Sequence, residues 1–252
     1  MDLRLQDRLA LVTGASRNIG RAIAAALARE GARIILVARS QEKLEVVRKE
    51  IATTEQKHYC YAIDLMEEDG VARLVKAITA DLGEPDIMVH NLGGSYGVTQ
   101  TFAPAEDWRK VWQYNLGIGH ELNCAFIPAM AKRRWGRIVH LSTLSTATYS
   151  GYAPYVSAKC ALDGYVKCVN REVSKDNVII SAVAPGAIYL EGRYLAKLQK
   201  EDPAAIEDYF KNFLPIRRLG TAEEIGPVVA FLCSDFASFM AGSIVGVDGG
   251  GM

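Results

Sequence analysis

The chain has 252 residues, of which 50% are hydrophobic, and its 29 basic and 29 acidic side chains give a formal net charge of zero. This length and composition allow one full-sized hydrophobic core. The charge balance excludes the basic excess that is typical of proteins binding nucleic acid or an anionic membrane surface. No apolar run of about 18 residues is present to span a bilayer.

The first eight residues carry four charged side chains and lead directly into a strand-like run. They lack the apolar stretch and the cleavage site of a secretory signal peptide. The five cysteines are scattered without a Cys-x-x-Cys pair, which favours reduced thiols over a disulfide framework or a zinc site. The four histidines also lack metal-ligand spacing, so we expect no metal. We therefore expect a cytoplasmic protein.

Apolar, strand-like runs alternate with helical patterns along the whole chain. Strands are expected at about Leu9–Val12, Arg33–Val37, His58–Ile63, Ile87–Val89, Arg137–Leu141, Val178–Val183 and Ser243–Val247. Helices are expected at about Gly20–Glu30, Gln41–Thr53, Met66–Leu82, Ala105–Arg134 (with a break), Tyr155–Ser174 and Ala222–Ser234. Strands that are apolar throughout are typical of a parallel sheet covered on both faces.

The alternation predicts an α/β fold: a single doubly wound, Rossmann-type domain over residues 1–252 with a mostly or wholly parallel seven-stranded sheet. Residues 189–215 have a helical pattern, and we interpret them as a substrate-binding lid inserted into this domain. The lid carries five aromatic residues that are candidates for a substrate wall or for ordinary packing: Tyr189, Tyr194, Tyr209, Phe210 and Phe213.

The first strand leads into the segment Thr13-Gly-Ala-Ser-Arg-Asn-Ile-Gly20, and a helix follows it. In this context, backbone N–H groups and the positive end of the helix bind phosphate. Gly14 permits a tight turn, and Gly20 permits close packing of helix and strand. Asn18 stands where a glycine is expected, and asparagine tolerates left-handed backbone angles better than most residues. The segment therefore predicts a dinucleotide pyrophosphate site, although its spacing differs from G-x-G-x-x-G.

The end of the second strand indicates which dinucleotide is bound. An acidic residue there holds the ribose hydroxyls of NAD, whereas an arginine suits the 2′-phosphate of NADP. The strand ends in Val37-Ala-Arg-Ser40, without an acid. Arg39 and Arg17 are both candidates for the extra phosphate, although solvated surface arginines would give the same pattern. The sequence favours NADP(H), with NAD(H) as the other possibility.

Tyr155 and Lys159 form the second motif, about 140 residues after the glycine-rich turn. Residues four apart are neighbours on one helix face. An ammonium beside a phenol favours phenolate and so lowers the tyrosine pKa. A tyrosine tuned toward neutral pH can act as a general acid or base on a ketone or an alcohol. Together with a nucleotide pocket, the pair predicts hydride transfer.

These motifs, in this order, resemble the short-chain dehydrogenase/reductase family over essentially the full chain. Further matching pieces are Asp64-Leu65, His90-Asn-Leu-Gly93, Asn115, Pro185-Gly186 and Val247-Asp-Gly-Gly250. The segment Arg218-Leu-Gly-Thr-Ala-Glu-Glu-Ile225 is similar to the 3-oxoacyl-(acyl-carrier-protein) reductase branch.

The resemblance implies that Tyr155 passes a proton to or from the substrate oxygen, that Lys159 lowers its pKa and holds the nicotinamide ribose, and that Asn115 positions a water in a proton relay. It implies a cofactor site formed by Gly14, Ser16, Arg17, Asn18, Ile19, Gly20, Arg39, Asp64, Leu65, Asn91, Gly93, Tyr155, Lys159, Pro185, Gly186 and Ile188. In that site Asp64 touches adenine, and Pro185, Gly186 and Ile188 cover the nicotinamide. Apart from the resemblance, Asp64 also suits a helix N-cap, and Asn115 suits a polar residue that distorts a helix.

The chain departs from the family pattern at Asn18, His90, Leu92 and Leu190. The catalytic hydroxyl is also ambiguous. Counting thirteen residues back from Tyr155 gives Ser142, whereas counting forward along the fifth strand gives Thr143. We favour Thr143, because a slipped strand would reverse every side chain.

The leading hypothesis is an oxidoreductase that reduces a ketone with NADPH, most consistent with a 3-oxoacyl-type reductase. The alternatives are a sugar, polyol or other secondary-alcohol dehydrogenase and, more remotely, a catalytically silent nucleotide-binding regulator. The substrate is a small carbonyl or alcohol, including a carrier-protein or CoA thioester. Lys132-Arg133-Arg134, with Arg171 and Lys175, is a candidate carrier-protein patch near the mouth of the site. The resemblance implies a homotetramer or homodimer joined through the C-terminal half.

Overall fold

The computed structural model describes residues 2–53 and 56–252. Its centre is a seven-stranded sheet in the order β3-β2-β1-β4-β5-β6-β7, and every neighbouring pair is parallel. The strands are β1 (Leu9–Thr13), β2 (Arg33–Ala38), β3 (Tyr59–Ala62), β4 (Ile87–His90), β5 (Gly136–Leu141), β6 (Val178–Pro185) and β7 (Ile244–Val247). The predicted doubly wound fold with a seven-stranded sheet is confirmed, and the sheet is wholly parallel.

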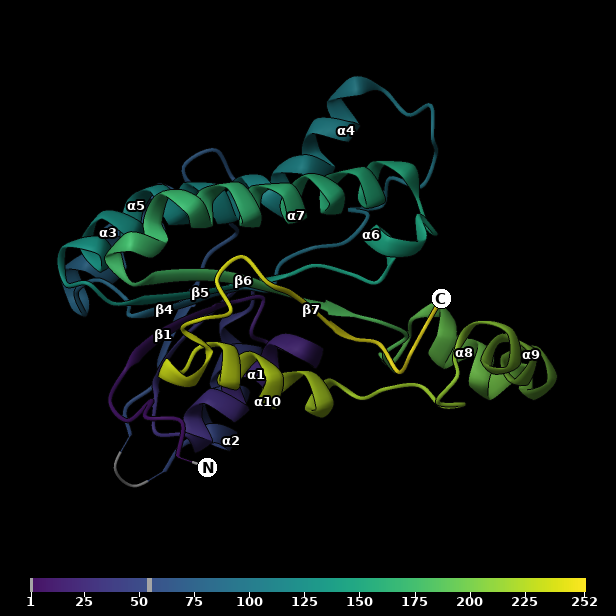
Figure 1. Ribbon diagram of the computed structural model, residues 1–252, viewed down its shortest axis with the longest axis horizontal. Helices are drawn as coiled ribbons and strands as arrows, with labels where there is room; N and C mark the ends of the chain where they lie inside the picture. Colours follow the sequence, from purple (N-terminus) through teal and green to yellow (C-terminus); the bar gives the residue numbers. More distant parts are fainter. Residues whose placement is uncertain (1, 54–55) are drawn as a thin grey trace.

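Helices cover both faces of the sheet (Figure 1). One face packs against α1 (Asn18–Arg29), α2 (Gln41–Ile51) and α10 (Ala222–Leu232), and the other against α3 (Gly70–Asp81), α5 (Ile118–Lys132) and α7 (Ala153–Val173). Successive strand residues point to opposite faces: Val12 belongs to the core under α1, whereas Leu11 belongs to the core under α7. Within the described part of the chain, no helix has the length and apolarity to span a bilayer.

The strand order changes direction between β1 and β4, because β1 pairs with β2 on one side and with β4 on the other. In an open α/β sheet such a switch leaves a crevice at the carboxyl ends of the strands, where ligands bind. The glycine-rich turn follows β1 and residues 91–94 follow β4, so both lie at this crevice.

The predicted break in the helical stretch from Ala105 to Arg134 is a π-helical turn, Gln113–Gly117, between α4 (Ala105–Trp112) and α5. Such turns are often found at functional sites. The turn contains Asn115, whose side chain donates to the carbonyl of Val111 at 2.8 Å. Asn115 therefore lies at a defined distortion of the helix and not on a regular helical surface.

Residues 189–215 contain two helices, α8 (Tyr194–Glu201) and α9 (Pro203–Phe213), which project beyond the sheet at its carboxyl end (Figure 1). Three of the five candidate aromatic residues, Tyr189, Tyr209 and Phe210, pack into a small core of this segment. The other two, Tyr194 and Phe213, are exposed by 74% and 51%. Packing in this small core therefore explains why Tyr189, Tyr209 and Phe210 are aromatic.

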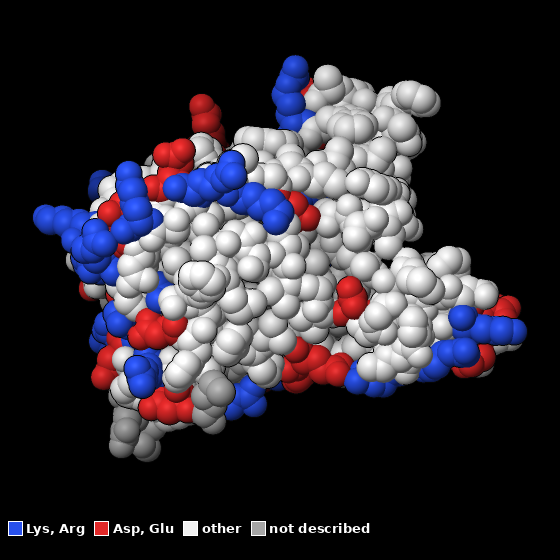
Figure 2. Space-filling model, in the orientation of Figure 1, with Lys and Arg blue, Asp and Glu red and all other residues white. Residues whose placement is uncertain are grey.

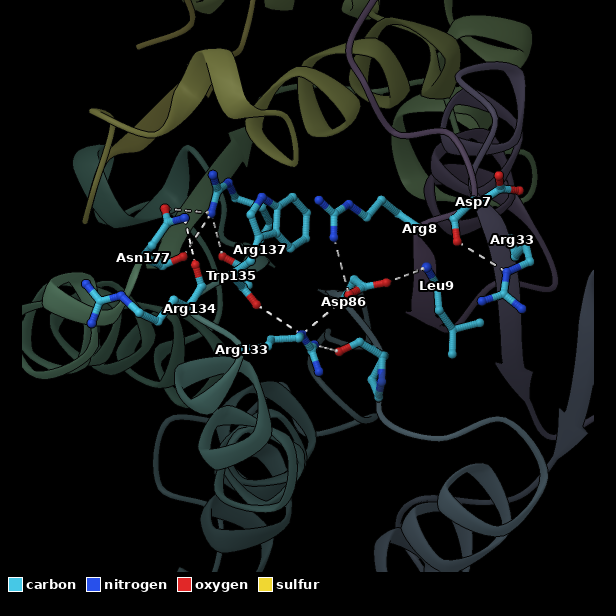
Figure 3. A network of polar contacts seen from close by, with 12 residues as sticks. Asp7, Arg8, Leu9, Arg33, Asp86, Arg133, Arg134, Trp135, Arg137 and Asn177 are labelled. Carbon is cyan, nitrogen blue, oxygen red and sulfur yellow. Dashed lines mark hydrogen bonds and ion pairs between the residues drawn. The ribbon is translucent and has the colours of Figure 1, made fainter.

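A polar network joins the amino ends of the strands (Figure 3). Asp86 pairs with Arg8 at 3.6 Å and with Arg133 at 3.4 Å. The ring of Trp135 lies between two guanidinium groups, with that of Arg8 3.7 Å and that of Arg137 4.7 Å from its centroid. This end of the sheet is therefore closed by charged and aromatic contacts.

The location of this network corrects the prediction of a carrier-protein patch at Lys132-Arg133-Arg134. Arg133 donates to the carbonyl of Pro85, next to the start of β4, and Arg134 donates to that of Lys175, just before β6. The patch thus lies at the amino ends of the strands, opposite the crevice. The sequence showed the charges but not the end of the sheet on which they lie.

Candidate active site

A cavity of about 520 Å³ lies in the crevice. Eleven of the predicted cofactor residues line it: Gly14, Ser16, Arg17, Asn18, Ile19, Gly20, Arg39, Asp64, Leu65, Asn91 and Gly93. These residues follow β1, β2, β3 and β4, so four separate stretches of sequence meet at one site. The meeting follows from the parallel sheet, in which the carboxyl ends of all strands share one edge.

The glycine-rich turn has the backbone geometry that its sequence predicts. Gly14 has φ +65° and Asn18 has φ +50°, both in the left-handed region. A Cβ on Gly20 would lie 2.2 Å from the carbonyl oxygen of Gly14, so no side chain fits there. Asn91 ties the turn to β4 by donating from Nδ2 to the carbonyls of Thr13 at 3.0 Å and Gly14 at 3.2 Å. The turn is therefore held against the sheet with its amides available to an anion.

Cationic side chains surround the part of the cavity that follows β2. Arg17, Arg39 and Lys43 all line it. Arg39 is 76% exposed, and its guanidinium lies 3.9 Å from the carboxylate of Asp64. Asp64 also accepts from the amide of Met66 at 3.0 Å, so it stabilises the turn after β3, whereas α3 begins only at Gly70. This donor set suits a phosphate group beside a ribose.

Sequence reasoning missed two cations in this cavity. Lys43 lies in the first turn of α2, four residues after Arg39. This spacing in the sequence could have indicated that both side chains lie at the same site. Arg193, at the start of α8, lines the cavity with Leu190 and brings the lid segment next to the cofactor residues. Its position depends on the path of the insertion, which no local pattern indicates.

The last residue of β5 and the two residues that follow it each meet a different residue of α7. The ammonium of Lys159 donates to the carbonyl oxygen of Leu141 at 2.5 Å. The hydroxyl of Ser142 donates to the carboxylate of Asp163 at 2.5 Å. The hydroxyl of the next residue, Thr143, lies close enough to the phenol of Tyr155 to lower its pKa.

The three α7 residues are four apart, so they share one face of the helix. The two candidate hydroxyls are therefore in different environments: Ser142 is bound to a carboxylate and is 5% exposed, and Thr143 is beside the tyrosine. Asp163 was not among the predicted site residues. Its position four residues after Lys159 was the signal that could have identified it.

Burial dominates the pKa values of the catalytic pair. Desolvation raises the pKa of Tyr155 above its ordinary value, and the nearby hydroxyl of Thr143 partly offsets this. Desolvation also lowers the pKa of Lys159 to about 8, while the charge of Asp163 acts in the opposite direction. The expectation that the neighbouring ammonium lowers the pKa of Tyr155 is therefore not met here, because the ammonium is directed to the Leu141 carbonyl.

Gly93 connects the cavity to the catalytic helix. A Cβ at this position would lie 2.8 Å from Nζ of Lys159 and 2.9 Å from Oδ1 of Asn115, so a larger residue would displace these two side chains. The next residue, Gly94, donates its amide to Oδ1 of Asn115 at 2.9 Å and accepts from its Nδ2 at 2.8 Å. Asn115 and Lys159 thus lie directly behind a loop that lines the cavity.

Five predicted cofactor residues do not line this cavity. Two are Tyr155 and Lys159 of α7, and the other three are Pro185, Gly186 and Ile188. Pro185 ends β6 and accepts from the amide of Leu144 at 2.9 Å, and Gly186 donates to the carbonyl of Val247 at 3.1 Å. Ile188 lines a separate cavity of about 50 Å³. The structure therefore places these last three residues near the carboxyl ends of β5, β6 and β7, beside but outside the main cavity.

Comparisons with known proteins agree with this architecture. A family model described as enoyl-(acyl carrier protein) reductase matches residues 14–251. The chain is 34% identical to the 3-oxoacyl-(acyl-carrier-protein) reductase FabG of Pseudomonas aeruginosa over 249 residues, which cover 98% of both chains.

Two solved structures have the same fold. L-sorbose reductase from Gluconobacter frateurii, complexed with NADPH and L-sorbose, gives a TM-score of 0.92 at 29% identity and covers 100% of this chain and 99% of its own. A 3-oxoacyl (acyl-carrier-protein) reductase from Agrobacterium tumefaciens with NADP bound gives 0.90 at 28% identity, with 99% and 96% covered.

The fold and the site together define an oxidoreductase that acts on a CH–OH group or its ketone. The chain belongs to the short-chain dehydrogenase/reductase family.

Proposed function

We propose that the protein reduces a ketone to a secondary alcohol with NADPH. The observation that carries this proposal is a cavity lined by a glycine-rich turn and four cationic side chains, with Lys159 and Asn115 directly behind its Gly93 loop. Tyr155, beside Thr143, lies one turn from Lys159 on the same helix. Retention of the complete set argues against a catalytically silent regulator.

The residues of the cavity fit a phosphorylated dinucleotide. Gly14 and Gly20 leave the turn free of side chains beside the pyrophosphate, and Arg17, Arg39 and Lys43 supply positive charge for a 2′-phosphate. The chain has no acid at the end of β2 to select NAD. When bound, the cofactor supplies the hydride.

The catalytic steps of the chain are proton transfers and positioning. We assign the proton transfer to the substrate oxygen to Tyr155, whose phenol keeps its proton at neutral pH because burial raises its pKa. The Thr143 hydroxyl is adjacent and hydrogen-bonds the same oxygen. Lys159 supplies a positive charge, and Asn115, in the π-helical turn, holds the loop at Gly94.

A short 3-oxoacyl thioester is the substrate class that we place first, because of the relative that is 34% identical over nearly the whole chain. A sugar ketone is the second, because the structure with a TM-score of 0.92 was determined with L-sorbose. In Figure 2, few charged side chains lie around the notch between α6 (Ser145–Thr148) and the α8–α9 pair, which suits an uncharged reacting group. If a carrier protein docks, it uses a surface other than Lys132–Arg134.

We also propose a cytoplasmic homotetramer or homodimer that associates through its C-terminal half. Phe236 and Phe239, which precede β7, are exposed. Apolar side chains of this size on one surface are typical of an interface.

The decisive experiment follows NADPH oxidation by absorbance with a short 3-oxoacyl thioester, a panel of sugar ketones and cyclic diketones, with NADH and Tyr155→Phe in parallel. Thioester turnover with NADPH that Tyr155→Phe abolishes supports the proposal. Turnover only on sugars or polyols supports the second substrate class. Tight NADPH binding without turnover of any carbonyl would instead identify a silent nucleotide-binding protein.

A further inference from the structure

We propose that Asp163 is a positioning residue that fixes Ser142 and thereby presents Thr143, the next residue, to Tyr155 and the substrate. This inference rests on the proposed reduction. It concerns a carboxylate that contacts neither the main cavity nor the phenol.

The first support is the register between the end of β5 and α7. Leu141, Ser142 and Thr143 are consecutive, and their partners Lys159, Asp163 and Tyr155 occupy three successive turns of one helix face. Without the contact between Ser142 and Asp163, the middle of this register of three contacts is lost. The segment between the sheet bonds of Ser142 and Leu144 could then shift, and the Thr143 hydroxyl would move relative to the phenol.

The second support is that the Ser142 hydroxyl is already engaged. It is 5% exposed, and its donated bond to Asp163 is charge-assisted and short. Its amide is also bound, donating to the carbonyl of Val183 at 2.7 Å. The hydroxyl has one hydrogen, and Asp163 already accepts it, so it cannot donate to a substrate oxygen. This role is left to Thr143.

The third support is electrostatic. Asp163 lies one helical turn from Lys159, and its negative charge raises the pKa of the lysine against the larger effect of desolvation. From β5, the buried His140 also interacts with Lys159, and His90 of β4 packs against His140 with ring centroids 4.4 Å apart. Burial lowers the pKa of both imidazoles and keeps them neutral, so Asp163 is the group that favours the lysine cation.

The test compares Asp163→Ala, Asp163→Asn and Ser142→Ala with Thr143→Val. We expect Asp163→Ala to lower kcat about 10- to 100-fold with little change in the KM for NADPH, because a displacement of about 1 Å at the reacting groups has this effect. Asp163→Asn keeps an acceptor for Ser142, so its kcat falls less. It removes the charge, so the alkaline limb of the pH profile moves to lower pH. Ser142→Ala should cost less turnover than Thr143→Val.

A double-mutant cycle isolates the contact. If Asp163 acts through Ser142, the fold reduction in kcat of the Ser142→Ala/Asp163→Ala double variant is smaller than the product of the fold reductions of the two single variants. Glu172→Gln, an exposed carboxylate of the same helix, is the matched control and should leave both kcat and the pH limb unchanged.

Two results would overturn the inference. One is a greater loss of turnover in Ser142→Ala than in Thr143→Val. The other is an Asp163→Asn variant whose kcat and pH limb match those of Glu172→Gln. If the wild-type protein turns over no carbonyl, a carbon NMR titration of the Lys159 side chain still tests the inference. Asp163→Asn must then lower the pKa of Lys159. Failure of the proposed function and failure of this inference are thus distinguishable.

Discussion

The ammonium nitrogen of Lys159 lies 2.5 Å from the carbonyl oxygen of Leu141, and this contact buries the lysine to 2% exposure. A carbonyl is a weak partner for a buried cation, because it offers a dipole and no compensating charge. The pKa of Lys159 accordingly lies at about 8. The catalytic cation is therefore held where its protonation changes within the working pH range of most enzymes.

We predict that kcat/KM for ketone reduction is constant below about pH 8 and falls above it. Lys159 loses its proton as the pH rises through its pKa of about 8, whereas burial raises the pKa of Tyr155, so the phenol loses its proton later. A pH profile of the rate with saturating NADPH and the ketone well below its KM gives kcat/KM and so measures the limb. In Lys159→Arg, which stays charged, the limb should disappear, although turnover also falls. A wild-type profile flat to pH 10 would contradict this assignment.

We predict that Arg39→Asp weakens NADPH binding about tenfold or more, because a charge-assisted contact to phosphate is replaced by repulsion. NADH binding should be unchanged or tighter. Nicotinamide fluorescence titrations measure both affinities. Arg29→Asp, an exposed change at the far end of α1, is the control for net charge. Unchanged or tighter NADPH binding in Arg39→Asp would show that the 2′-phosphate is held elsewhere.

The buried histidine pair predicts acid sensitivity. His90 hydrogen-bonds through Nε2 to Oδ1 of Asn123 at 2.9 Å, and its Nδ1 has no partner among the residues that the structure describes. Burial lowers its pKa from about 6.5 to about 4. Because the unfolded chain binds the proton more readily, this contribution to stability is present above about pH 6.5 and is lost as the pH falls toward 4.

From that shift, His90 alone should remove about 3 kcal/mol from the free energy of unfolding between pH 6.5 and 4. Urea titrations at several pH values in this range measure how steeply the free energy of unfolding falls with pH. His90→Asn should flatten this dependence, whereas His120→Asn, at an exposed position on α5, should not. Equal slopes in wild type and His90→Asn would exclude His90 as the source.

We predict that Arg137→Met destabilises the protein by about 3 kcal/mol, because the backbone carbonyls that the buried guanidinium binds lose their hydrogen-bond donor. Arg137 is 1% exposed, pairs with Asp235 at 3.0 Å and donates to the carbonyl of Ser234 at 3.2 Å. Its network lies at the end of the sheet opposite the cavity (Figure 3), so kcat of the folded variant should be unchanged. Arg134→Met, an exposed neighbour, should have little effect on stability. Urea unfolding and steady-state kinetics measure the two quantities, and a loss of kcat without a loss of stability would be the contrary result.

The sequence by itself determined the parallel, doubly wound sheet, the glycine-rich turn and the placement of Tyr155 and Lys159 on one face of a helix. Each of these depends on local physics: apolar runs without alternation, the tolerance of Gly14 and Asn18 for positive φ, and the four-residue period of a helix. The meeting of the predicted residues that follow β1, β2, β3 and β4 at one cavity was also predictable, because parallel strands end at one edge.

Only the tertiary structure decided which contacts the motifs make. Whether Ser142 or Thr143 faces Tyr155 depends on how the end of β5 packs against α7, and sequence counting left both open. The pKa of Tyr155 depends on burial and on where the lysine points. The place of Lys132–Arg134 and of Arg193 depends on which end of the sheet each loop reaches. These features arise from residues distant in sequence, so no local pattern specifies them.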